Sequence, residues 1–206
     1  MGFVKGGATL TRYRIFEEPE AGLTDEFISE RLTANAFVDI EETSEESSQG
    51  WVQFFDHLEA TFPPEAFHFH PIVAFSLRLD ERKLPNKILN RYMAIAEARF
   101  IAEIGKKPNA AKKRDMKDAL RLDLLKRSLL DTQLFEVIWL LENNEVWLGA
   151  TGERNRSLFE ESWLRTFGLG LRLLVPVTVG LEVLEKPART RLMALKEPSF
   201  FGADDE

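Results

Sequence analysis

The sequence predicts an α+β fold in which helices cover an antiparallel sheet and a two-helix arm projects from it. Several short stretches alternate in the manner of strands, while other stretches repeat their apolar residues at helical spacing. The Gly-rich turn that joins strand to helix in parallel α/β folds is absent from the sequence. An antiparallel sheet with covering helices is therefore the predicted architecture.

The N-terminal part holds a strand, a helix and a loop. β-forming side chains alternate over 9–16 and predict a strand. Thr24 is the predicted N-cap of a helix that reaches about Phe37 and carries acidic residues in its first turn. The stretch 41–50 is rich in Glu and Ser, and we interpret it as a solvated loop.

Four further strands are predicted on either side of a helical region. Pro71 should bend the second of them or place it at an edge of the sheet. Asn143 and Asn144 tolerate the backbone of a tight turn, so the last two should form a hairpin. The predicted ranges are 51–55, 67–80, 135–141 and 146–150.

The predicted arm lies between these strands and begins after Leu84-Pro85. Its first helix ends at Gly105, and a polar linker, 106–111, leads to a second helix over 112–130. Such a short linker favours an antiparallel pair of helices. The apolar face of the first helix consists of Leu89, Met93, Ala96, Phe100 and Ile104.

A helix over 155–167 and a strand over 169–175 are predicted next, and the pattern weakens after Pro187. We divide the chain into an N-terminal part of the core, the helical arm, the remainder of the core and a C-terminal tail. Their ranges are 1–84, 85–130, 131–186 and 187–206.

Composition limits the function classes. A length of 206 residues fits one domain or one domain with an appendage. Cysteine is absent, which excludes disulfides, thiolate catalysis and cysteine-held metal clusters. No run reaches the ~18 apolar residues of a membrane span, and the first residues lack a signal-peptide pattern. We expect a cytoplasmic protein without a membrane partner.

The net charge of −7 argues at first against a nucleic-acid partner, but the charge is unevenly distributed. Eleven acids and one base lie between Glu17 and Glu46, whereas nine bases and three acids lie between Gly105 and Arg127. Because salt screens exposed charges beyond ~8 Å, a bound polyanion senses the local patch. An acidic protein can therefore carry a basic contact surface.

The basic patch lies on the second arm helix. At 100° per residue, Lys113, Arg114, Lys117 and Arg121 fall within about 100° of its circumference. Such a stripe suits a phosphate backbone. An ordinary solvated helix face is the alternative interpretation.

Two other patterns suggest chemistry. His68 and His70 share one face of a predicted strand, and His57 could supply a third metal ligand. Glu65, Glu81 and Lys83 follow the order of metal-dependent nucleases, in which carboxylates hold Mg²⁺ and a lysine orients water. The sequence indicates no carboxylate or fourth ligand beside the histidines, so we expect no metal there. A P-loop, a nucleophile elbow and a dinucleotide fingerprint are absent, so we expect no cofactor.

Several segments, taken in order from about Thr9 to Pro176, resemble the bacterial recombination-associated RdgC family. The layout includes Arg12-Tyr13-Arg14 near the N-terminus and the helix 157–167 after the hairpin. The chain resembles a shortened member, because family members are longer after Val175. The segments are Gly50-Trp51-Val52, Leu77 to Pro85, Gly105-Lys106-Lys107, Lys117-Asp118, Leu124-Leu125 and Ile138-Trp139-Leu140.

The resemblance implies a non-enzymatic protein that binds duplex DNA without sequence preference. Family members form a ring-shaped homodimer around DNA and restrain RecA-driven recombination, so a nucleoid-associated protein with a recombination partner is implied. The arm would then be a finger involved in ring closure. The phosphate contacts that we expect are Lys106, Lys107, Lys113, Arg114, Lys117 and Arg121.

Two alternatives remain open at this point. One is the metal-dependent nuclease suggested by Glu65, Glu81 and Lys83. The other is a protein-interaction module of the same fold that uses the acidic segment 17–46 and does not bind DNA.

Overall fold

The computed structural model describes residue 3, residues 6–7, 9–16 and 22–195. The C-terminal part of the predicted tail, 196–206, and the acids Glu17, Glu18 and Glu20 of the acidic segment lie outside the described residues. No helix in the described part of the chain is long and apolar enough to cross a membrane.

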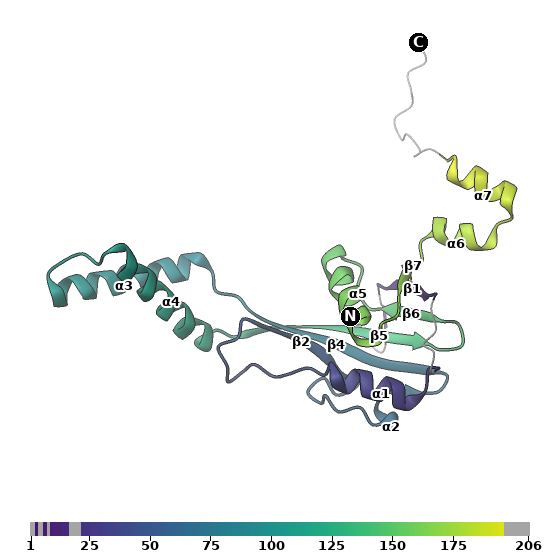
Figure 1. Ribbon diagram of the computed structural model, residues 1–206, viewed down its shortest axis with the longest axis horizontal. Helices are drawn as coiled ribbons and strands as arrows, with labels where there is room; N and C mark the ends of the chain where they lie inside the picture. Colours follow the sequence, from purple (N-terminus) through teal and green to yellow (C-terminus); the bar gives the residue numbers. More distant parts are fainter. Residues whose placement is uncertain (1–2, 4–5, 8, 17–21, 196–206) are drawn as a thin grey trace, which may run out of the picture.

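An antiparallel sheet of seven strands forms the body of the molecule (Figure 1). The strand order is β2-β4-β5-β6-β1-β7, and β3 pairs with the start of β4. The strands are β1 (Thr11–Ile15), β2 (Ser47–Gln53), β3 (His68–Phe69), β4 (Ile72–Arg82), β5 (Leu130–Leu140), β6 (Glu145–Leu148) and β7 (Leu171–Leu173).

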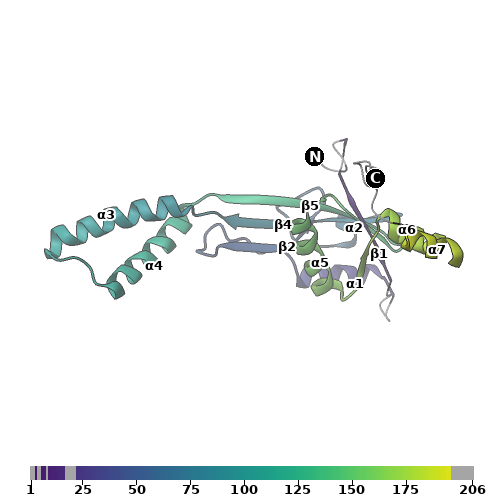
Figure 2. The ribbon, with the colours of Figure 1, turned by 90° about the horizontal axis from the view of Figure 1, so that it is seen from above.

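Seven helices accompany the sheet within the described residues, which confirms the α+β class. Helices α1 and α5 contact each other and share the buried cluster on one sheet face. Helices α3 and α4 form the arm at one end, and α6 and α7 project from the other (Figures 1 and 2). Their bounds are α1 (Asp25–Ala34), α2 (Pro64–Phe67), α3 (Asn86–Ile104), α4 (Ala110–Arg127), α5 (Glu153–Phe167), α6 (Pro176–Val183) and α7 (Lys186–Met193).

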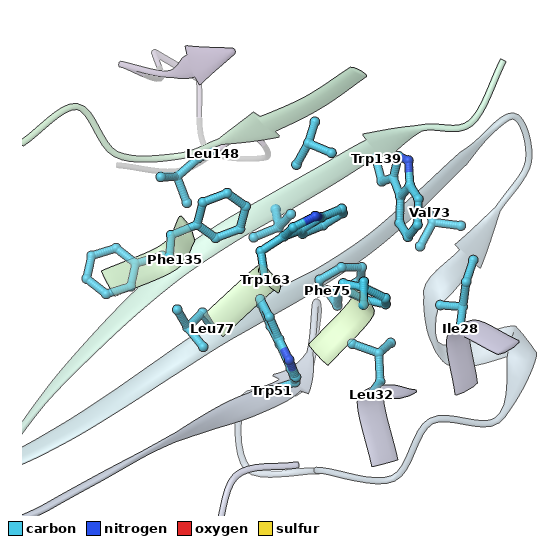
Figure 3. Packing of buried hydrophobic residues seen from close by; sticks show 14 of the residues in the cluster. Ile28, Leu32, Trp51, Val73, Phe75, Leu77, Phe135, Trp139, Leu148 and Trp163 are labelled. Carbon is cyan, nitrogen blue, oxygen red and sulfur yellow. The ribbon is translucent and has the colours of Figure 1, made fainter. Parts of the chain in front are cut away.

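The core lies between the sheet and the two covering helices, α1 and α5. Trp163 of α5 is fully buried and packs edge-on against Trp139 of β5, with ring centroids 4.9 Å apart (Figure 3). Trp51 of β2 donates its indole N–H to Thr166 Oγ1 at 2.7 Å, so the polar tip of this buried ring is satisfied. Six of the sixteen Phe and three of the four Trp in the sequence belong to this one buried cluster.

Strand β2 begins at Ser47, inside the stretch predicted as a loop. All seven of its residues pair with β4, and Glu- and Ser-rich composition obscured this. Gly50 of β2 also allows the segment after α1 to lie against this strand, because a Cβ at this position would lie 2.4 Å from the Cα of Phe37. The predicted loop therefore ends at Glu46, and we call residues 39–46 the acidic loop.

The prediction that Pro71 bends the strand is confirmed, since the chain turns at His70-Pro71 between β3 and β4.

The predicted end of the second arm helix at 130 is wrong. Helix α4 ends at Arg127, and Leu130 already belongs to β5, which pairs along its whole length with β4. Asp131 and Thr132 are exposed and Gln133 is half-buried, so the start of β5 shows no apolar alternation in the sequence.

The C-terminal region differs most from expectation. The strand predicted over 169–175 is reduced to β7, and two helices follow it. Pro176 occupies the first turn of α6, and the hydroxyl of Thr178 accepts the backbone N–H of Val175 at 2.8 Å. The apolar run 169–175 had favoured a strand, but this cap starts a helix at Pro176.

Candidate nucleic-acid interface

The arm continues the two longest strands of the sheet. Strand β4 leads into α3 and α4 leads back into β5, so two eleven-residue strands carry the helix pair away from the body (Figures 1 and 2). Gly105 ends α3 with φ of 72°, a conformation that glycine adopts without strain. Asn109 then caps α4 by accepting the backbone N–H of Lys112 at 2.8 Å. The predicted antiparallel arm is confirmed.

A shallow apolar groove of about 330 Å³ lies between the two arm helices. Tyr92 and Ile95 of α3 line it and are 44% and 41% exposed, which is high for large apolar side chains. Met116 and Leu120 of α4 form the opposite wall.

The six predicted phosphate contacts are all exposed, but they do not form one free stripe. Lys106 and Lys107 lie in the turn between the arm helices. Among the described residues, these two and also Arg114 and Lys117 of α4 have no acidic partner.

The other two predicted contacts are engaged within the protein. The Nζ atom of Lys113 lies 3.0 Å from Glu97 Oε2 of α3. Arg121 donates to both carboxylate oxygens of Glu46, at 2.7 and 2.9 Å, across 75 residues of sequence. These two cations join the arm helices to each other and the arm to the acidic loop 39–46.

Arg82, at the end of β4, fixes the base of the arm from below. Its Nη1 donates to the carbonyl oxygens of Leu125 and Ser128, at 2.9 and 2.8 Å, and so caps the C-terminus of α4. Its Nη2 donates to the carbonyl oxygens of Ile40 and Glu41, at 2.8 and 2.7 Å. One buried guanidinium therefore joins the sheet, the arm and the acidic loop.

A second basic surface lies on the sheet face opposite the core. Arg12 and Arg14 of β1 each contact the buried Glu145 of β6, at 2.8 and 2.9 Å. Arg172 of β7 stands directly opposite Arg14 in the antiparallel register, so it belongs to the same face. Burial raises the pKa of Glu145, but hydrogen bonds from Arg12, Trp147 and Arg14 outweigh burial and hold the pKa below its ordinary value.

Comparison with known protein families shows which family the chain belongs to. Residues 9–168 match the family described as "Putative exonuclease, RdgC". The chain belongs to the RdgC family. No curated protein matches it.

The family's description directs attention to the nuclease-like residues of this RdgC-family chain. The structure does not bring them together. Glu65 lies on α2, which leads into β3 and so meets β4 near Val73, whereas Glu81 lies eight residues further along β4. At about 3.3 Å per residue the two places are roughly 26 Å apart along the strand, too far for carboxylates that share one Mg²⁺.

The remaining members of that pattern are engaged in ion pairs. Glu81 accepts from Arg154 of α5 at 2.7 Å, and Lys83 pairs with Asp131 of β5.

The three histidines also do not converge on a metal site. His68 pairs through Nδ1 with Asp25 Oδ1 at 2.7 Å, and its ring centroid lies 6.2 Å from that of His70. Within the described residues, no group of three His, Asp or Glu side chains is arranged to hold an ion. The backbone carbonyl of His57 accepts a hydrogen bond from Arg78 Nη1 at 3.3 Å.

Sequence reasoning missed two features of this RdgC-family chain, the basic sheet face and Arg82. The alternation of Arg12 and Arg14 in a predicted strand was a signal for the first. For the second, Arg78, Asp80 and Arg82 alternate in an otherwise apolar strand and are all buried, which is unusual for charged residues.

Proposed function

We propose that this RdgC-family protein is a non-enzymatic protein that binds duplex DNA without sequence preference, and that it acts with the recombination machinery on RecA-type activity. Family membership over 9–168 is the observation that carries the proposal. The exposed, unpaired cations of the arm support it, since lysine and arginine on a projecting element contact phosphates irrespective of sequence. A nucleoid-associated location would follow from such binding.

The four unpaired cations make the sharpest test. We expect fluorescence anisotropy to give similar affinities for unrelated duplexes, and the affinity to fall steeply with salt. A variant with Lys106, Lys107, Arg114 and Lys117 all changed to Gln should bind more weakly. Its salt slope should fall by about 0.9 for each phosphate that the variant no longer neutralises.

The matched control changes four exposed cations that lie on α1, α5 and α7 and not on the arm, namely Arg31, Arg165, Lys186 and Arg191, to Gln. It should bind as the unaltered protein does. Equal weakening in both variants would assign the effect to net charge and remove the arm from the interface.

The family's description favours one test of the alternative function. Labelled duplex and single-stranded DNA should stay intact during incubation with Mg²⁺ or Mn²⁺. Metal-dependent shortening of the substrate that Glu81→Ala abolishes would replace the proposal with nuclease activity.

The ion pair between Glu46 and Arg121 bears on the other alternative, a protein-interaction module. In that case the acidic loop would meet a basic partner protein and DNA would not bind even at low salt. Anisotropy in a low-salt buffer separates this outcome from the proposal.

A further inference from the structure

A polar hollow of about 500 Å³ lies at the base of the arm, on the sheet face away from the core. Its floor comes from β4 and β5, where Arg78, Arg82 and Thr132 lie on the same face of neighbouring strands. Its walls come from the end of α4, with Lys126 and Arg127, and from Glu41 of the acidic loop. None of the six predicted phosphate contacts lines it.

Two of the four cations that line the hollow are neutralised by neighbouring carboxylates. Arg78 donates from Nε and Nη2 to the two oxygens of Asp80, at 3.1 and 2.7 Å. Arg127 pairs with Asp123 one turn earlier on α4, at 3.0 Å.

The other two cations are not neutralised in this way. Arg82 is only 7% exposed, and its guanidinium donates to backbone carbonyls alone, so its full charge remains. Its Nε atom is buried and has no hydrogen-bond partner in the described structure. Lys126 is exposed and, within the described residues, has no acidic partner.

This arrangement favours an anion in the hollow. A buried charge is weakly screened, so Arg82 projects a positive potential into the space above it. The carbonyls at the C-terminus of α4 would oppose an anion, but Arg82 already satisfies two of them. Lys126 and the exposed hydroxyl of Thr132 supply mobile donors at the rim, and Glu41 is the one acid of the lining.

We propose that this hollow binds a phosphate group, carried either by a nucleic-acid backbone or by a free phosphate or mononucleotide. A tetrahedral oxyanion suits a hollow with the charge of Arg82 in its floor and with donors at its rim from Thr132 of β5 and Lys126 of α4. This proposal is independent of the DNA contact proposed for the arm, because none of the six predicted phosphate contacts lines the hollow.

The test is a titration of the full chain with inorganic phosphate, followed by the side-chain Nε–H signals of its arginines in NMR spectra. We expect a saturable shift of the Arg82 and Arg78 signals. Lys126→Gln and Thr132→Val should each weaken the binding about three- to tenfold, the effect of losing one ordinary hydrogen bond at an exposed position. Both residues are exposed, so neither variant should fail to fold.

Lys112→Gln is the matched control, since Lys112 is an exposed lysine of the same helix away from the hollow. Equal weakening in the control, or shifts of these signals that do not saturate, would overturn the proposal.

A second titration with duplex DNA distinguishes the two sources of the phosphate group. Displacement of phosphate by DNA assigns the hollow to the backbone, and failure of DNA to displace it assigns the hollow to free phosphate or a mononucleotide.

Discussion

Glu46 and Arg121 form an exposed ion pair that competes with the proposed DNA contact. Glu46 accepts two hydrogen bonds from Nη2 and one from Nε of Arg121, so a phosphate can use this guanidinium only after the pair opens. Exposed ion pairs contribute about 0–1 kcal/mol, so opening the pair costs little but affects affinity.

Glu46→Gln should therefore raise affinity for duplex DNA about two- to fivefold at fixed salt, as expected for the removal of an exposed ion pair. In an Arg121→Gln background the same change should have a much smaller effect, which a double-mutant cycle by anisotropy measures. Glu26→Gln, on α1 far from the arm, is the charge-matched control. Identical increases in both backgrounds would show that Glu46 acts by net charge alone.

Arg82 holds the arm, the sheet and the acidic loop together through its hydrogen bonds to backbone carbonyls. Arg82→Met keeps most of the side chain but leaves carbonyl oxygens of α4 and of the acidic loop without a donor. We expect the free energy of unfolding to fall by about 2–4 kcal/mol, because buried polar groups lose their partners.

Urea denaturation followed by circular dichroism measures this decrease. Lys83→Met is the control, since its side chain is 62% exposed and its pair with Asp131 lies at the surface. The control should stay within about 1 kcal/mol of the unaltered protein. Similar decreases for both variants would contradict the assigned role of Arg82.

At the scale of elements, β2 depends on one close approach. The backbone N–H of Phe37 donates to the Trp51 carbonyl at 2.9 Å, and the Trp51 N–H donates to the Asn35 carbonyl at 3.0 Å. The chain leaving α1 is thus held against β2 at Gly50, where a side chain does not fit.

Gly50→Ala should lower the free energy of unfolding by about 1–3 kcal/mol, because the backbone must move to admit a methyl group. Gly152→Ala is the control: the nearest atom to a Cβ there lies at 3.8 Å, an ordinary contact. Thermal denaturation of the two variants gives the comparison. A neutral Gly50→Ala would mean that the segment after α1 adapts easily.

At the scale of the whole molecule, the arm extends beyond the body and carries an uncovered apolar groove. We propose that the protein is a homodimer, as the family resemblance implies, and we infer from the exposed groove that a second copy covers it. Removal of this apolar surface from water would contribute a favourable free energy to association of two copies.

Ile95→Glu should then shift the protein from dimer to monomer in light scattering over a concentration series. Ile88→Glu is the matched control, because Ile88 is 43% exposed on the same helix but does not line the groove. A protein that is monomeric before any substitution would rule out the dimer.

The charge division seen in the sequence takes a different form in three dimensions. Basic residues of the arm and acidic residues of 39–46 were separate along the chain, yet Arg121 and Glu46 are in contact. The net charge of −7 therefore conceals partial neutralisation at the base of the arm, while the arm's turn keeps Lys106 and Lys107 unpaired.

The sequence by itself determined the α+β class, the two-helix arm, its glycine stop and the family. These properties depend on local periodicity, on signals such as the Thr24 cap and the Gly105 stop, and on an ordered set of short motifs. Only the tertiary structure decided where β2 starts, which arm cations are free, and that Arg78, Arg82 and Lys126 meet in one hollow. Those outcomes depend on contacts between residues far apart in the chain, and local patterns contain no information on such contacts.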